Sequence, residues 1–359
     1  MNRSDGFRNL AQMGCAATLV CVCALAPVAL IAQPGAPADK QASEQPYHVI
    51  DHWKIGGEGG WDYLHDDSAA HRLYIAHGPR VEVIDTETGK PVGAITGLHG
   101  THGIAFDTAG KYGYISDGGG NAVVVFDRKS LATVATIPAG TNPDGIVFEP
   151  VTQSVWAFNG RSHNVTVIDA ASMKVFDTIA LPGKPEFPAV DGQGHVFDNI
   201  EDKSEIVRLD AREKTITGEW PAGCDSPSGL AFDVAGHRLF PVCDGEKMAV
   251  VNSEDGTLMG TASIGDGPDA ARWSAKYKLA FASSGDGILS VVDAGAKGYP
   301  TIEKLPTQKG ARTMAYDPAT DRIYTVTAEF GPRPEPTPQM PRPRPSVVPG
   351  SFTVIVIGR

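Results

Sequence analysis

Seven positions, one in each of seven repeated segments, carry the side chains of this chain that are best placed to do chemistry together. Alignment of the segments puts the following residues at equivalent places near the start of each: Asp62, His102, Asp144, Glu186, Ser228, Asp269 and Arg312. Six of the seven are ionisable, and four are carboxylates. Crowded carboxylates raise one another's pKa, whereas an arginine opposes that shift. Such a ring predicts a site for a polar ligand, a cation or an acid–base pair.

Two interpretations of this ring remain open from the sequence. In the first, the ring binds a ligand, and Trp61, which follows Gly59 and Gly60 at a segment start, is the one tryptophan expected to reach it. In the second, the polar side chains only hold water or satisfy nearby backbone groups.

Histidines beside the ring supply a candidate metal site. His99 and His102 are separated by two residues and have an Asp nearby, a donor set that zinc or copper accepts. Loops at different radii need not converge, so the spacing alone does not decide whether a divalent metal binds. His65 is expected to serve packing. The chain has no Gly-x-Ser-x-Gly nucleophile, phosphate-binding glycine loop or His-Glu-x-x-His pair, so no catalytic residue and no further cofactor is predicted.

A repeat of about 42 residues sets the elements that position the ring. Third strands of the form Val-x-Val-x-Asp end at steps of 42, 42, 41, 42 and 41 residues, at Asp85, Asp127, Asp169, Asp210, Asn252 and Asp293. Each segment has four short runs rich in Val, Ile and aromatic residues, separated by Gly, Asp, Asn and Pro. This pattern is typical of β-propeller blades. We therefore predict an all-β, seven-bladed β-propeller in which the repeated Asp residues form turns.

The two ends of the chain are expected to complete the last blade together. The seventh segment reaches its third strand at residues 352–357 and lacks a fourth. Residues 47–55 form a spare strand, so the N-terminal strand is predicted to close the last blade of a propeller that spans residues 47–359. Residues 328–351 are a proline-rich insertion in blade seven, on the same face as the ring. This insertion acts either as a lid or docking strap or as a solvated extension.

These features resemble the YVTN/YncE-like family of bacterial seven-bladed β-propeller repeat proteins. The resemblance rests on the Val-x-Val-x-Asp strands, on blade openings such as Asn-Pro-Asp-Gly at residues 142–145, and on the swapped closing strand. It covers residues 47–359 and is specific for the fold rather than for one function. It implies a secreted binding or scaffold protein, and more distant seven-bladed relatives include lactonases and lyases.

The first residues have the order of an export signal. In residues 1–32, Arg3 and Arg8 precede an apolar stretch, which predicts a secretory signal peptide. An uncleaved anchor is the alternative, although Pro27 interrupts the stretch. Residues 33–46 are expected to be a disordered tether. The expected location is periplasmic or secreted, without a membrane span in the mature chain.

The net charge limits the expected partners, and the cysteines indicate the redox compartment. The formal net charge is −11 and the blades contain no basic run, so nucleic-acid binding is not expected. Cys224 and Cys243 fall at the same end of adjacent antiparallel strands, which predicts a disulfide in an oxidising compartment. Free thiols or a metal-binding pair are the alternatives. A monomer is expected.

Together the observations favour a binding or scaffold protein that uses the loop face around its channel to bind a small polar ligand or a protein partner. The alternative is a lactonase- or lyase-like enzyme with acid–base or metal-assisted chemistry, carried by His102, Asp144, Glu186 and Asp269. An enzyme needs two of these groups within reach of one substrate atom, or a metal bound by three of them. A purely structural module, whose partner lies across the proline-rich insertion, is a third possibility.

Overall fold

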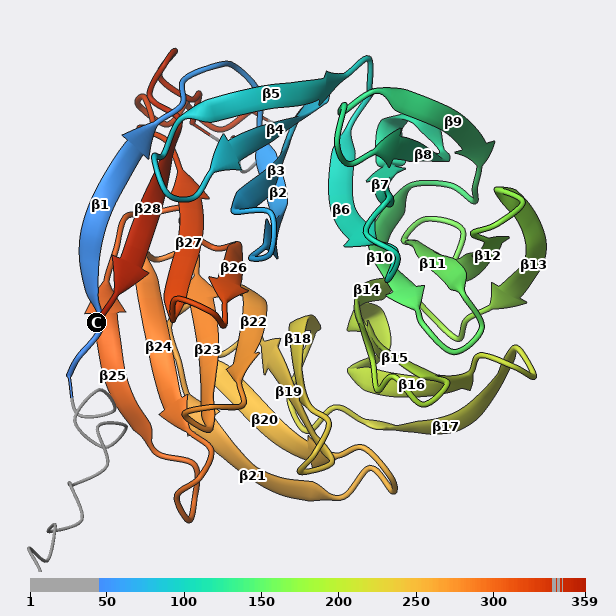
Figure 1. The fold of residues 1–359 in the computed structure, drawn as a ribbon. Coiled ribbons are helices and arrows are strands. Elements are labelled where there is room, and N and C mark those ends of the chain that lie inside the picture. The colour runs from blue at the N-terminus through green and yellow to red at the C-terminus, as the bar shows by residue number, and fades with distance from the viewer. Residues whose placement is uncertain (1–44, 338–339, 341–342, 344) are drawn as a thin grey trace, which may run out of the picture.

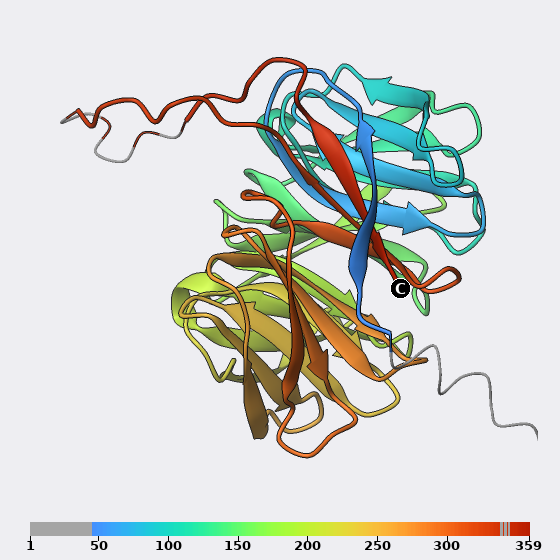
Figure 2. The same cartoon turned by 90° about the vertical axis from the view of Figure 1, so that its left-hand side faces the viewer.

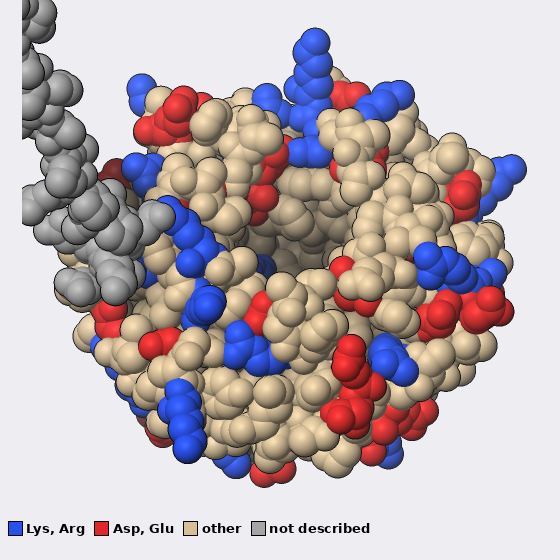
Figure 3. Space-filling view, turned by 60° about the horizontal axis from the view of Figure 1, so that its bottom comes forward, with Lys and Arg blue, Asp and Glu red and all other residues tan. Residues whose placement is uncertain are grey.

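Short antiparallel strands make up nearly all of the regular structure in the computed structural model, which describes residues 45–337, 340, 343 and 345–359. Over these residues the strands form seven four-stranded sheets. Figure 1 shows the sheets as blades around a central space, and a space-filling view of one face is hollowed at its centre (Figure 3). The predicted all-β, seven-bladed β-propeller is therefore confirmed.

Each blade takes its strands in chain order, and the last blade alone draws on both ends of the chain. Blades one and two contain β2 (Trp61–Asp67), β3 (Arg72–His77), β4 (Arg80–Asp85), β5 (Pro91–Thr96), β6 (Thr101–Phe106), β7 (Tyr112–Asp117), η1 (Gly118–Gly120), β8 (Ala122–Asp127) and β9 (Thr133–Pro138). Blades three and four contain β10 (Pro143–Glu149), β11 (Ser154–Asn159), β12 (Asn164–Asp169), β13 (Lys174–Ala180), β14 (Pro185–Val190), β15 (His195–Ile200), η2 (Glu201–Lys203), β16 (Glu205–Asp210) and β17 (Thr215–Pro221). Blades five and six contain β18 (Pro227–Asp233), β19 (Arg238–Cys243), β20 (Lys247–Asn252), β21 (Leu258–Ser263), β22 (Pro268–Ser274), β23 (Leu279–Ser284), β24 (Ile288–Asp293) and β25 (Thr301–Pro306). Blade seven contains β26 (Met314–Asp317), β27 (Arg322–Thr327), β28 (Thr353–Gly358) and β1 (His48–Lys54).

The hydrophobic core lies between the blades rather than within any one of them. Middle strands such as β11 are buried along their whole length, because each sheet packs face to face on two neighbours. Between blades five and six, for example, Phe240 and Val250 pack with Ala282. Each of the seven interfaces between neighbouring blades has one such cluster. Outer strands such as β13 are mostly exposed.

The Asp residues that end the third strands form hairpin turns, as the repeat predicts. Asp85 accepts hydrogen bonds from the backbone N–H and the hydroxyl of Thr88, both at 2.8 Å. Asp127 accepts the equivalent pair from Ser130, at 2.8 and 2.9 Å. These hydrogen bonds hold the pKa of both carboxyls below the usual range. The repeated Asp residues are thus explained by turn formation.

The N-terminal strand closes the ring by pairing with the C-terminal one. β1 lies antiparallel to β28 from His48 opposite Gly358 to Lys54 opposite Thr353, and Figure 2 shows the two strands side by side. Tyr47, just before β1, is buried against Phe281 of blade six with ring centroids 5.4 Å apart. The closure predicted from the missing fourth strand is therefore present.

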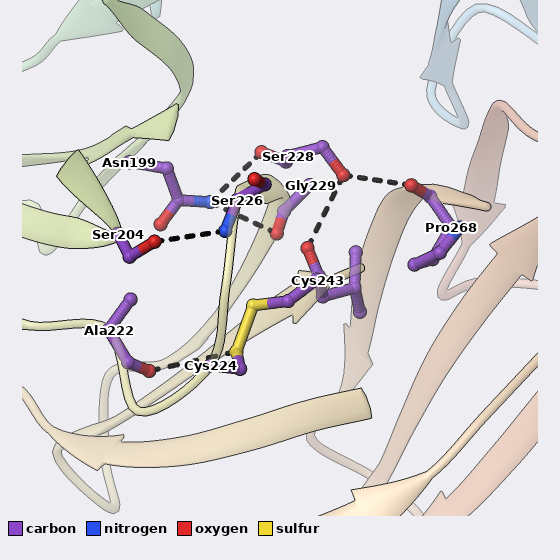
Figure 4. The surroundings of a disulfide bond; sticks show 10 residues. Asn199, Ser204, Ala222, Cys224, Ser226, Ser228, Gly229, Cys243 and Pro268 are labelled. Atoms are coloured by element: carbon purple, nitrogen blue, oxygen red, sulfur yellow. Dashed lines mark hydrogen bonds between the residues drawn. A yellow bond between two sulfur atoms is a disulfide. The ribbon is translucent and has the colours of Figure 1, made fainter. Parts of the chain in front are cut away.

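A disulfide joins Cys224, in the loop that enters blade five, to Cys243 at the end of β19 (Figure 4). Their Cα atoms are 5.9 Å apart, and both residues are buried. The pairing predicted from strand placement is present, and it fixes the loop between blades four and five to the second strand of blade five.

The proline-rich insertion connects β27 to β28 and is anchored at its base. Phe330 pairs with Val347, the N–H of Gly331 donates to Ser346 O, and the N–H of Val348 donates to Glu329 O, both at 2.8 Å. The described part beyond this base extends away from the blades (Figure 2).

The predicted signal peptide, residues 1–32, lies outside the described residues, as does the predicted tether up to residue 44. Within the described part of the chain, no helix has the length and apolar character needed to cross a membrane.

Removal of β1 should destabilise the whole ring. A variant that begins at residue 55 leaves the edge of β28 unpaired and uncovers part of the interface between blades six and seven. We expect its thermal midpoint to fall by roughly 5 °C or more, since each kcal/mol of lost stability moves the midpoint of a domain this large by about 1.5–2 °C. A variant that begins at residue 45 keeps β1 and serves as the control. Equal midpoints for both variants in a thermal unfolding scan would contradict the role of the closing strand.

Candidate functional site

The first strands of the blades position the predicted ring through a shared irregularity. In each of the first six blades the pairing of the first and second strands shifts register beside the ring residue, as between Trp61 and Leu64 in blade one. A bulge of this kind bends the strand and redirects a side chain. All seven predicted ring residues, from Asp62 to Arg312, line a single cavity of about 500 Å³. We call it the polar cavity.

His102 lies between two carboxylates in this cavity. Its Nδ1 is 2.5 Å from Asp62 Oδ2 and 3.7 Å from Asp144 Oδ1. Burial lowers the pKa of His102, but the Asp62 hydrogen bond and the charge of Asp144 outweigh this and raise it to about 9. The imidazole is therefore a cation at neutral pH, held in an ion pair with Asp62.

The other carboxylates of the ring face cations. Lys184 forms ion pairs with both Glu186 and Glu201, and Arg312 Nη1 lies 2.7 Å from Asp269 Oδ2. Arg161 also lines the cavity. The site therefore combines both signs of charge rather than forming the simple acidic ring that the four carboxylates suggest.

Partial burial keeps protons on these carboxyls at higher pH than usual. Burial raises the pKa of Asp144 to about 7, against the opposing charge of His102. Burial, with the charge of Asp144, raises the pKa of Glu186 to about 8 although Lys184 opposes it. Burial raises the pKa of Asp269 to about 6, and Arg312 opposes this shift. Three carboxyls in one cavity can thus exchange protons near neutral pH.

Three side chains at mid-height divide the channel into the polar cavity and a second cavity below it. The rings of Tyr63 and Phe187 stack with centroids 5.0 Å apart, and the Arg272 guanidinium lies 5.1 Å from the Phe187 centroid. Arg272 Nη2 also donates to Leu64 O at 3.3 Å. These three residues line both cavities. We call them the channel plug; it links blades one, four and six.

Sequence reasoning missed the plug and the extra cations, although the repeat contained a signal for them. The position after each ring residue is Gly, Ala or Thr in five blades, and only Tyr63 and Phe187 are bulky there. The position three after the ring residue is Ala or Val in five blades, and only His65 and Arg272 depart from that rule. Lys184, two residues before its ring residue, carried no comparable signal.

Several predicted site residues have other surroundings. The Ser228 hydroxyl donates to Pro268 O at 2.8 Å and to Val242 O at 3.3 Å, so it joins neighbouring strands while it lines the cavity (Figure 4). Trp61 does not line the polar cavity. It packs on Phe352 and Phe330, with centroids 5.4 and 6.0 Å away, and lines a neighbouring pocket beside the insertion that shares Arg312 with the polar cavity.

The two candidate metal-binding histidines are also not brought together as a pair. His99 Nδ1 lies 3.0 Å from Asp117 Oδ2 instead. Among the described residues, the one group of three or more with potential metal-ligand atoms within 4.8 Å of one another is Asp62, His102 and Asp144. His65 packs on Phe106 and its Nδ1 lies 2.8 Å from Ile104 O, in agreement with a packing role, but it also lines the lower cavity.

Comparison with known proteins supports the fold alone. No family model and no curated protein matches this sequence. Similar solved structures include that of U3-55K, with a TM-score of 0.69 at 10% identity over 86% of this chain and 98% of the other. The RRP9 WD40 repeats align with a TM-score of 0.68 at 11% identity over 87% and 97%. A chain of hydrazine synthase from Kuenenia stuttgartiensis aligns with a TM-score of 0.65 at 15% identity over 75% and 92%.

The raised pKa values predict that the protein loses stability as pH rises. Asp144, Glu186 and His102 all bind a proton more tightly in the folded chain than in the unfolded one. The contribution of these protons to the stability of the fold is complete below the ordinary pKa of each group. It is lost as pH passes the raised pKa values, about 7 for Asp144, 8 for Glu186 and 9 for His102. Because the groups interact, we expect a loss of about 3 kcal/mol in the free energy of unfolding between pH 5 and pH 9.

Urea denaturation at pH 5, 7 and 9 measures this effect. The double variant Asp144→Asn/Glu186→Gln should have a flatter profile. The control Asp85→Asn removes a turn carboxylate whose pKa is lowered, so its effect belongs to acid pH. A wild-type protein that is more stable at pH 9 than at pH 5 would show that the cavity does not retain these protons.

Proposed function

We propose that this chain is a binding protein of the YVTN/YncE-like type, and that its polar cavity binds a small polar ligand or a polar group presented by a protein partner. One observation carries the proposal. Six first strands and the residue Arg312 just before the seventh bring one ring residue from every blade to a cavity that the channel plug closes from below. A channel that merely held water would need neither six ionisable residues nor a floor. The established part is the seven-bladed scaffold, which is compatible with binding.

The charges of the cavity favour a ligand that has both donors and acceptors, or both signs of charge. Glu186 and Asp269 each have a cation at hydrogen-bond distance, whereas Asp144 is 3.7 Å from its nearest one. Asp144 is therefore the carboxylate freest to accept a hydrogen bond from a ligand. Arg161 and Arg312 offer donors to a ligand carboxylate or hydroxyl group. Zwitterions and polyhydroxylated acids fit this description.

We further propose that the protein acts in the periplasm or is secreted. The order of charged and apolar residues in 1–32 supports export. The Cys224–Cys243 disulfide supports an oxidising compartment, because reducing cytosols disfavour structural disulfides. A polar solute or a partner protein of that compartment is then the ligand.

A ligand screen with matched variants tests the binding function. We expect amino acids or sugar acids to raise the thermal midpoint of the wild-type protein, and calorimetry to give a dissociation constant for the best compound. Arg312→Ala and Glu186→Gln should each weaken it about tenfold or more, as loss of a charged hydrogen bond does. The controls Arg212→Ala and Glu213→Gln alter the exposed hairpin of blade four and should leave it unchanged. Binding that survives both cavity variants would contradict the proposal.

An enzyme is the second candidate, and the group Asp62, His102 and Asp144 favours it. Their ligand atoms lie close enough to hold one divalent cation, with two carboxylate oxygens and one imidazole nitrogen. Such a cation would supply Lewis-acid chemistry. Without a cation, the protonated His102 is placed to donate a proton and Asp144 to accept one. Either arrangement suits lactonase- or lyase-like reactions at the channel mouth.

Equilibrium dialysis against Mn²⁺, Zn²⁺ or Ca²⁺, followed by elemental analysis, tests the metal. We expect one ion per chain in the wild-type protein and none in His102→Ala. Binding should weaken as pH falls from 8 to 6, because the metal must displace the proton of His102. Asp269→Asn, in the same cavity but outside the group, is the control. Equal metal content in the wild-type protein and His102→Ala would exclude this site.

A further inference from the structure

The channel has a second cavity, of about 470 Å³, on the side of the plug away from the polar cavity. Its walls come from the later residues of the first strands. The positions three after the ring residue are mostly small and leave the space open: Ala105, Val147, Ala189, Ala231 and Ala315. The positions four after it add aromatic rings: Phe106, Phe148, Phe232, Trp273 and Tyr316. This lower cavity is therefore mainly apolar, in contrast to the polar cavity.

Arg272 brings a positive charge to the inner end of this apolar space. Its Nη1 donates to Ala271 O at 2.8 Å and its Nη2 to Leu64 O, and its guanidinium lies against the Phe187 ring. No ion pair joins Arg272 to a carboxylate within the described part of the chain, whereas Arg312 of the polar cavity pairs with Asp269. Burial lowers the pKa of Arg272 to about 10, and no carboxylate offsets this. A desolvated cation without a counter-ion is costly unless a ligand supplies one.

An anion should reach Arg272 from the lower cavity rather than from the polar one. The polar cavity is also lined by Arg161, Lys184 and Arg312, which would hold an anion there before it reached Arg272, whereas Arg272 is the one Lys or Arg among the described residues that line the lower cavity. In the lower cavity the one carboxyl is Asp66, and burial raises its pKa to about 7. His65 is not a second cation there, since burial lowers its pKa to about 4. One unpaired positive charge therefore faces an apolar space, which suits a monoanion.

We propose that the lower cavity is a second binding site, separate from the polar cavity, for a small monocarboxylate with an aromatic or branched aliphatic body. The carboxylate pairs with the Arg272 guanidinium at the plug. The body lies against the alanine and aromatic side chains of the wall, where burial of its apolar surface adds affinity. A guanidinium suits this role because its planar donors can bind both oxygens of one carboxylate. The single charge at the inner end excludes dicarboxylates.

Isothermal titration with benzoate and its neutral analogue benzamide tests the proposal on the full chain. We expect benzoate to bind about tenfold or more tightly than benzamide, because only benzoate pairs with Arg272. Arg272→Gln should reduce that ratio to about one, and Arg272→Lys should restore part of it. The matched control is Arg161→Gln, because Arg161 lines the polar cavity and not the lower one. This variant should leave benzoate binding unchanged.

Two further measurements distinguish loss of binding from loss of folding and test whether the two cavities are independent. Thermal unfolding of Arg272→Gln should show a midpoint no lower than that of the wild-type protein, since the variant removes an uncompensated charge. Glu186→Gln, which alters the polar cavity, should not change benzoate affinity. Absence of benzoate binding, equal affinity for benzoate and benzamide, or an unchanged ratio in a folded Arg272→Gln would each overturn the proposal. Loss of benzoate binding in Glu186→Gln would show that the two cavities are not separate sites.

Discussion

Face-to-face packing between neighbouring sheets is the constraint on which the rest of this structure depends. No blade buries its own faces, and each of the seven hydrophobic clusters is shared by two blades. The interfaces therefore stabilise the fold only as a closed set, and the pairing of β1 with β28 closes it. The same closure creates the channel. Each blade contributes at least one residue to the polar cavity, so the site exists only when all seven blades are in place.

The repeat in the sequence explains how much could be predicted. Residues at equivalent repeat positions occupy equivalent places in a ring. The sequence alone therefore predicts that Asp62, Asp144 and Arg312 lie around one channel, and all three line the polar cavity. The same logic predicted Cys224 with Cys243 and the closing strand. The repeat does not predict which side chains from different blades contact one another across the channel. The contact of Tyr63 with Phe187 joins blades one and four, and it depends on the diameter of the ring and on side-chain length rather than on the repeat. The repeat also could not place Trp61 beside Phe330, because that neighbour comes from the insertion, which breaks the repeat.

The two halves of the channel illustrate how one strand can serve opposite chemistries. Along the first strands of the first six blades, the bulge at the start directs a polar side chain into the upper half, and the following residues supply mostly alanines and aromatic rings to the lower half. The plug keeps these environments apart. Above it, charges of both signs compensate one another in Glu186–Lys184 and Asp269–Arg312. Below it, the charge of Arg272 has no carboxylate partner among the residues that the structure describes. Charge balance, rather than volume, is what distinguishes the two cavities.

The position of the closing strand has a consequence for the order in which the protein can assemble. Among the described strands, β1 is the first to be synthesised and β28 the last, so their pairing must wait until all the intervening blades have been synthesised. Until then six complete blades and the start of a seventh form an open arc, whose two terminal interfaces expose apolar surface that the finished ring buries. Contacts between residues this far apart in sequence form slowly, and exposed strand edges invite association with other chains. The nascent chain therefore remains open to wrong contacts until β28 has been synthesised, and this is the stage at which a chaperone would matter most.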